Sequence, residues 1–332
     1  MGKIPVGQTI GQAYAFAFGK YLPILGVLWL PFLVLAVAGY FAIAPMFPII
    51  MDIFHHGAQL QLHPGDKGLP IEDMQRLQQL NGRVLAFDVL ELAVIAMVSV
   101  GIVKEAMGGR TGFRFAYLKF GLEELLVAGA YFLLWILLVF AIVVAAIAAA
   151  IIIAGIVAAA GRTGQTPSGP AVGLAVLVGF AACASVFYVA VRLAFFIVPV
   201  TVAEREFGVF RSWELTKGNF WRIFGVLFVC WVPALVVFYA VVGAVLGFSV
   251  VPAAIREAQK YAPKDPAAVQ AVFNVLMDGL RRSWPYLLGA YAVTAPIFCG
   301  LVFGPAAFAY RVLMPAKPAA EHGTLAGATA VT

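Results

Sequence analysis

Three ionisable residues lie inside long apolar runs of the sequence and are the first candidates for chemistry: Asp88, Glu91 and Arg192. A charge inside a membrane is costly, so such residues often mark an ion or substrate path. A structural role is favoured for each. Asp88 and Glu91 fall in the first turns of a predicted helix, where water and the helix dipole favour carboxylates. Arg192 is within snorkelling reach of the headgroups. Alternative partners for Arg192 are the carboxylates near that face, Glu123, Glu124 and Glu204.

One loop holds the single cluster of metal-ligand residue types, His55, His56 and His63 with Asp52 and Asp66. Their spacing matches no regular pattern of zinc ligands, so a solvated loop is favoured over a metal site. The sequence contains no nucleophile elbow, zinc-protease, Walker A or dinucleotide-binding motif. The loops outside the membrane are also too short for a separate catalytic domain. We therefore expect a protein that is not an enzyme and that carries no cofactor.

The composition is that of an integral membrane protein. The 332 residues are 63% hydrophobic and 11% charged, whereas soluble domains have about 25% charged residues. The formal net charge of +6 requires no nucleic acid, because Lys and Arg held on the cytoplasmic side produce such a balance. The sequence thus excludes a soluble enzyme or nucleic-acid-binding protein as the main interpretation, and membrane lipids are expected partners.

Six segments are long and apolar enough to cross a hydrocarbon core, which takes about 20 residues of helix. They are residues 22–44, 85–103, 125–150, 173–199, 223–250 and 286–309. We expect one membrane domain over 1–313 and a disordered cytoplasmic tail over 314–332. An inside N-terminus places more than half of the 22 Lys and Arg residues on the inner side, so both termini are predicted to be cytoplasmic. Short separate helices are predicted in two outer loops, over 70–81 and 265–279.

A local pattern recurs before three of these spans. An aromatic residue is followed twelve positions later by glycine in Tyr14 to Gly26, Tyr117 to Gly129 and Trp213 to Gly225. This recurrence predicts an all-α fold built as three repeats, each an interfacial helix followed by two spans. The interfacial helices are expected over residues 7–20, 110–121 and 205–220. Their aromatic side chains are expected to anchor them among the lipid headgroups.

Two pairs of glycines lie one helical turn apart within predicted spans, Gly243 with Gly247 and Gly300 with Gly304. Small residues at this spacing let membrane helices approach closely without a hydrophobic driving force. We expect the first pair to pack within the fold against the second pair.

The segment from Val202 to Gly225, VAEREFGVFRSWELTKGNFWRIFG, resembles a stretch of bacterial six-span proteins related to the membrane domain of some glycerophosphoryl diester phosphodiesterases. The uncharacterised YciC-like inner-membrane proteins look similar. The resemblance covers most of the chain in layout and only this stretch in letters. It implies the bacterial inner membrane. It implies no catalytic residues, because the chain has no room for the roughly 250-residue barrel on which such phosphodiesterase chemistry would be carried.

These observations favour a non-enzymatic multi-pass inner-membrane protein that acts through lipids or a membrane-protein partner. The alternative is a transporter or pore for apolar or lipid-like solutes, and an enzyme is the least favoured class. The scarcity of ionisable groups within the spans argues against ion-coupled transport.

The predicted topology can be tested with reporter fusions. A fusion at Lys317 should place its reporter in the cytoplasm, and a fusion at Gly164 should place it in the periplasm, because six crossings separate the two termini and three precede Gly164. Paired fluorescent-protein and alkaline phosphatase fusions measure this directly. A periplasmic reporter at Lys317 or a cytoplasmic one at Gly164 would contradict the topology.

Overall fold

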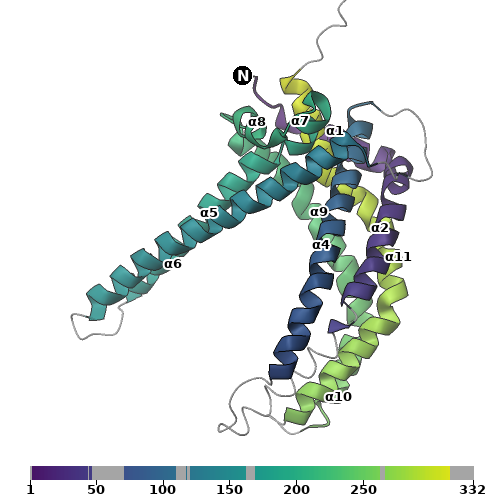
Figure 1. Ribbon diagram of the computed structural model, residues 1–332, viewed down its shortest axis with the longest axis vertical. Helices are drawn as coiled ribbons and strands as arrows, with labels where there is room; N and C mark the ends of the chain where they lie inside the picture. The colour runs from purple at the N-terminus through teal and green to yellow at the C-terminus, as the bar shows by residue number, and fades with distance from the viewer. Residues whose placement is uncertain are drawn as a thin grey trace, which may run out of the picture.

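The computed structural model describes residues 2–43, 45–46, 71–109, 117, 120–161, 169–261 and 266–314, and every regular element in these ranges is a helix (Figure 1). The elements are α1 (Val6–Gly19), α2 (Tyr21–Ile43), α4 (Ile71–Ala106), α5 (Leu122–Gly161), α6 (Gly169–Ala194), α7 (Ile197–Glu204), α8 (Gly208–Leu215), α9 (Phe220–Ser249), α10 (Val251–Ala258) and α11 (Pro266–Leu313).

Six of the helical segments are long and apolar enough to cross a membrane, in agreement with the sequence. They are Tyr21–Ala42, Asn81–Ala106, Leu122–Ile156, Val172–Glu204, Phe220–Phe248 and Ala271–Leu313. The N-terminus and the end of α11 lie at the same end of the molecule, as an even number of crossings requires (Figure 1). The predicted helical, multi-pass membrane class is confirmed.

Four of the long helices, α2, α4, α9 and α11, form an elongated bundle, with α11 in contact with the other three (Figure 1). The core near the N-terminal end is made of branched aliphatic and small side chains, including Ile24, Val27, Val100 and Ile102. At Gly101 a Cβ would lie 2.8 Å from Val27 Cγ1, so the glycine allows α2 and α4 to approach closely.

The remaining two long helices, α5 and α6, pack against each other and diverge from the bundle as a hairpin (Figure 1). α5 is one continuous helix of 40 residues, as expected for its long uncharged run. The hairpin contacts the bundle through α4 and α9, and contacts α7 and α8 near its base. Its sides are apolar and open, with Phe140 67% exposed and Phe180 73% exposed.

Three shorter helices, α1, α7 and α8, gather at the end of the molecule that holds the N-terminus, and we call them the collar (Figure 1). The fourth span, predicted over 173–199, is interrupted near its end: α6 ends at Ala194, and α7 continues the same candidate span to Glu204. The Ser212 hydroxyl occupies the break: it donates to the Arg192 carbonyl and accepts from the Phe196 N–H, each at 3.0 Å. A hydroxyl placed between these two groups replaces the direct backbone bond and ends the helix.

The two helices predicted in outer loops are not separate elements. Residues 71–81 begin α4, and residues 266–279 begin α11, each without a break before the span. Gly279, the last residue of the second predicted loop helix, is a contact position within α11, since a Cβ there would lie 2.8 Å from Val250 Cγ1. A helical glycine costs only about 1 kcal/mol relative to alanine, which good packing overrides.

The predicted pairing of the two glycine motifs is wrong. A Cβ at Gly243 or Gly247 would meet nothing within 4 Å. A Cβ at Gly300 would lie 2.9 Å from Ala17 Cβ and 3.0 Å from Ala17 Cα, and one at Gly304 would lie 3.2 Å from Phe16. The second motif therefore packs against the collar helix α1 and not against α9.

This difference predicts that one added methyl group changes stability differently at Gly300 and at Gly243. Gly300→Ala should destabilise the protein by about 1–3 kcal/mol, because the added carbon collides with the backbone of α1. Gly243→Ala, the matched control in an open helical position, should be neutral or stabilising by up to about 1 kcal/mol. Thermal unfolding in mild detergent measures both. Equal melting temperatures for the two variants would contradict the α1–α11 contact.

Candidate functional site

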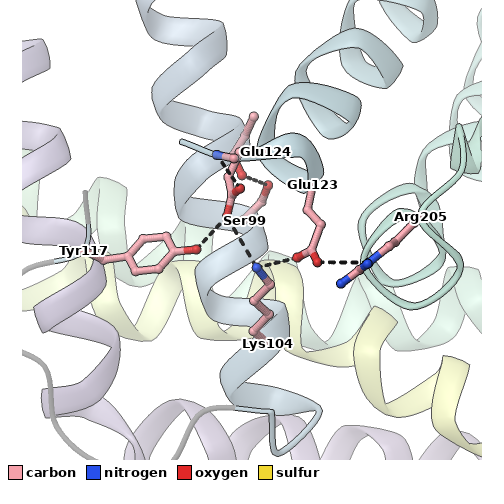
Figure 2. A network of polar contacts seen from close by, with 8 residues as sticks. Ser99, Lys104, Tyr117, Glu123, Glu124 and Arg205 are labelled. Carbon is pink, nitrogen blue, oxygen red and sulfur yellow. Dashed lines mark hydrogen bonds and ion pairs between the residues drawn. The ribbon is translucent and has the colours of Figure 1, made fainter. Parts of the chain in front are cut away.

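A network of charged residues joins the end of α4 to the start of α5 (Figure 2). Lys104 Nζ lies 2.5 Å from Glu123 Oε2 and 3.4 Å from Glu124 Oε1. Arg205 Nε lies 3.5 Å from Glu123 Oε1 and links α7 to the same carboxylate. Two cations thus face two carboxylates, and the network is neutral overall.

Local sequence explains why Glu124 is buried with its charge. α5 begins at Leu122, so Glu124 is the third helical residue, from which a side chain can reach back to the preceding backbone. The Gly121 N–H donates to Glu124 Oε2 at 2.9 Å, and the Tyr117 hydroxyl donates to Glu124 Oε1 at 2.7 Å. Glu124 is 1% exposed, so these donors replace the water that it has lost.

A cavity of about 170 Å³ lies beside this network and is lined by Lys104, Gly121, Leu122, Glu123, Glu124 and Arg205. The carboxylates that line it already bind the two cations. Arg205 adopts a left-handed backbone conformation with φ 57° at the end of α7, which costs about 1–2 kcal/mol for a residue with a side chain. The arrangement fixes three helices to one another and leaves no carboxylate in it without a cationic partner.

Arg192 lies in a second polar cluster, between α6 and α8, and is 8% exposed. Its Nε donates to Thr216 Oγ1 at 3.2 Å, and its two terminal nitrogens donate to the Tyr188 hydroxyl at 3.0 Å and the Trp213 carbonyl at 2.8 Å. The guanidinium carbon lies 3.8 Å from the centroid of the Trp213 ring, a cation–π contact. Both sequence explanations are wrong, because Arg192 neither snorkels to solvent nor pairs with Glu123, Glu124 or Glu204 within the described residues.

Asp88 and Glu91 are not brought to either cluster. Both are exposed on α4, and none of the ion pairs among the described residues includes them. Lys104 lies 13 residues beyond Glu91, which corresponds to about 20 Å along a helix. The two carboxylates therefore lie far from the collar, on a surface of the bundle and not on the lining of the cavity beside Lys104.

The three aromatic residues of the repeated pattern differ in environment. Tyr14, in α1, donates to the Val229 carbonyl at 2.9 Å, and burial raises the pKa of its phenol. Trp213, in α8, is half-exposed beside Arg192. Tyr117 is not in a helix and is only 5% exposed, so its predicted role as an interfacial anchor is wrong. Its hydroxyl is needed by Glu124, and its ring packs against Gly101 of α4.

Two further predictions concern residues that lie largely outside the described ranges. The histidine-containing loop from Asp52 to Asp66 lies wholly outside them, and so does most of the predicted helix over 110–121. In the described parts of the chain, no group of three or more His, Cys, Asp or Glu side chains could hold a metal ion.

The sequence analysis did not identify Lys104 or Ser212 as residues of these clusters. It also did not predict that the Glu124 side chain reaches back to the Gly121 N–H. The Glu123–Glu124 pair directly before an uncharged run was a usable signal, since acidic residues favour the first turn of a helix. Ser212 and Thr216 carried no such signal, because their partners are about 20 residues distant in sequence.

Comparison with known proteins gave no match to this chain among family models, curated proteins or solved structures.

The Glu124 network predicts a large effect from a single truncation. Glu124→Ala should destabilise the protein by about 3 kcal/mol, because it removes the acceptor of the Gly121 N–H and the bonds that the buried carboxylate makes with Tyr117 and Lys104. Glu214→Ala, which breaks an exposed ion pair with Arg211, is the control and should cost less than about 1 kcal/mol. Thermal unfolding and limited proteolysis in detergent measure both. Similar losses in the two variants would show that the buried network contributes no special stability.

Proposed function

We propose that this chain is a non-enzymatic multi-pass protein of the bacterial cytoplasmic membrane that acts through lipid or protein partners. The observation that carries the proposal is the α5–α6 hairpin, whose apolar sides the rest of the described chain leaves uncovered. Such a surface is stable only against lipid or against another membrane protein.

The length of the hairpin supports a partner surface. The apolar part of α5 covers 35 residues, or about 52 Å of helix, against a hydrocarbon core of about 30 Å. A helix of this length has to tilt strongly or extend beyond the core. In either arrangement the hairpin presents its sides well away from the bundle, as its divergence in Figure 1 suggests.

The polar groups support a partner role over ion-coupled transport. The charges of Glu124 and Arg192, which are buried, and of Lys104, which is partly buried, are satisfied at the collar end by other groups of the chain. Asp88 and Glu91 face outward from α4. Ion-coupled transport uses ionisable groups that face a shared interior path. These two carboxylates lie instead on the outer surface of the bundle.

We also propose that the chain consists of three repeated units arranged in cyclic order. In support, each repeated aromatic residue contacts spans of the preceding unit: Tyr14 contacts α9, Tyr117 contacts α4, and Trp213 contacts Arg192 of α6. The second span of each unit likewise contacts the first span of the next, in the pairs α4 with α5, α6 with α9 and α11 with α2.

We place the collar and both termini on the cytoplasmic side. The charge distribution supports this orientation, because Lys20, Lys104, Lys217, Arg222 and Arg311 belong to the segments at the collar end, and basic residues favour the cytoplasm. The resemblance of residues 202–225 to bacterial six-span proteins supports the inner membrane and transfers no activity.

The proposal can be tested against transport in reconstituted vesicles that carry a fluorescent phospholipid. We expect the fraction of label that external dithionite reduces to be the same with and without the protein, because the ionisable groups of the described residues form no interior path. A protein-dependent increase would instead support the alternative, a transporter for lipid-like solutes, and contradict the proposal.

A second measurement tests the hairpin itself in cells. A photo-crosslinking amino acid at Phe140 or Phe180 should give a discrete cross-linked species, because these positions face the proposed partner. Val236 on α9, 61% exposed, is the matched control and should give only diffuse lipid adducts. The same pattern at all three positions would contradict a partner surface on the hairpin.

A further inference from the structure

A cavity of about 530 Å³ opens at the collar end between α1 and the last turns of α11. Its lining residues are Gln12, Ala15, Phe16, Gly19, Lys20, Phe308, Arg311 and Val312. These residues lie where the candidate span of α2 begins, at Tyr21, and where that of α11 ends, at Leu313. The cavity therefore lies beside the ends of these two candidate spans.

Two cations line this cavity, and both have hydrogen-bond donors to spare. Lys20 Nζ lies 3.3 Å from Glu105 Oε1, a contact that uses one of three donors. The Arg311 guanidinium donates to the Ala106 carbonyl at 3.5 Å. Within the described residues no carboxylate forms an ion pair with Arg311, although the group has five donors. With Glu105 counted, the cavity carries one net positive charge.

Apart from Gln12, the rest of the lining is apolar. Phe16 and Phe308 meet edge to face, with ring centroids 5.7 Å apart. A Cβ at Gly304 would lie 3.2 Å from the Phe16 ring, so α11 passes close to this side chain. A cavity of this volume is in the range that holds a small organic ligand, about 300–1,000 Å³, and exceeds what an inorganic anion requires. The lining thus suits a molecule with an anionic group at one end and an apolar part at the other.

We propose that this cavity binds the headgroup region of an anionic phospholipid, with its phosphate between Lys20 and Arg311 and the start of an acyl chain against Phe16 and Phe308. The planar guanidinium of Arg311 offers two parallel donors to a phosphate, and Lys20 adds a point charge. The location beside the ends of two candidate spans supplies the lipid without a path through the protein. This inference rests on the proposed role through lipid partners and names the lipid class and its site.

Native mass spectrometry of the protein in neutral detergent tests the site with three probes: phosphatidylglycerol, phosphatidylcholine and inorganic phosphate. The wild-type protein should bind phosphatidylglycerol at least fivefold more tightly than phosphatidylcholine. Arg311→Gln should reduce this preference to less than twofold, because the bidentate donor is lost. Lys217→Gln, an exposed cation at the same end and outside the cavity, is the matched control and should leave the preference unchanged.

Lys20→Gln would also leave Glu105 without its cation. Lys20→Arg keeps the charge and is therefore made beside it, and it should keep the preference for phosphatidylglycerol. An unchanged preference in Arg311→Gln, or an equal loss in Lys217→Gln, would overturn the site in favour of general surface attraction. Displacement of phosphatidylglycerol by millimolar inorganic phosphate would overturn the lipid assignment in favour of a soluble phosphate ester. The two proposals can fail separately. Loss of the phosphatidylglycerol preference would overturn this site without changing the dithionite assay. Protein-dependent lipid movement in that assay would contradict the proposed function without changing the binding measured here.

Discussion

The carboxylate of Glu124 is the interaction on which the arrangement of the long helices depends. It caps α5 through the Gly121 N–H, accepts the hydroxyl of Tyr117 and faces the ammonium of Lys104 near the end of α4. A charge with 1% exposure is stable only with such partners. These polar contacts join the start of α5 to the end of α4, beside the apolar packing of Val127 and Ala130 in the core.

The second helix of the hairpin, α6, is also held by polar contacts at the collar end. Ser212 interrupts the backbone bonding between Arg192 and Phe196, and Thr216 and Trp213 of the adjoining segment hold the Arg192 side chain. Between the other helices, contact relies on close approach at small residues such as Gly101 and Gly300, because apolar side chains gain little by leaving lipid for protein. A polar bond also joins two of these long helices, since the Tyr21 hydroxyl of α2 donates to the Val293 carbonyl of α11 at 3.3 Å.

Composition and run length were sufficient to predict the helical membrane class and the six spans, because hydrocarbon permits few alternatives to long apolar helices. The partners of individual side chains were not predictable. Arg192 could be recognised as costly, yet its neutral partners in α8 and the turn after it lie 21 and 24 residues further along the chain. The glycine spacing of Gly243 and Gly247 matched that of Gly300 and Gly304, and only the fold shows that the first pair has open space while the second contacts α1. Tyr117 shared its local pattern with Tyr14 and Trp213 and still became buried, since Glu124 lies close enough to bind it.

The anchoring of the hairpin near one end gives it the mechanics of a lever. Both fixed points, the Glu124 network on α5 and the Ser212–Arg192 contacts on α6, lie at the collar, while the apolar part of α5 extends about 52 Å from there. A rotation of about 5° at this fulcrum displaces the far tip by about 5 Å, the rise of one helical turn. Small changes in the collar are consequently amplified along the hairpin.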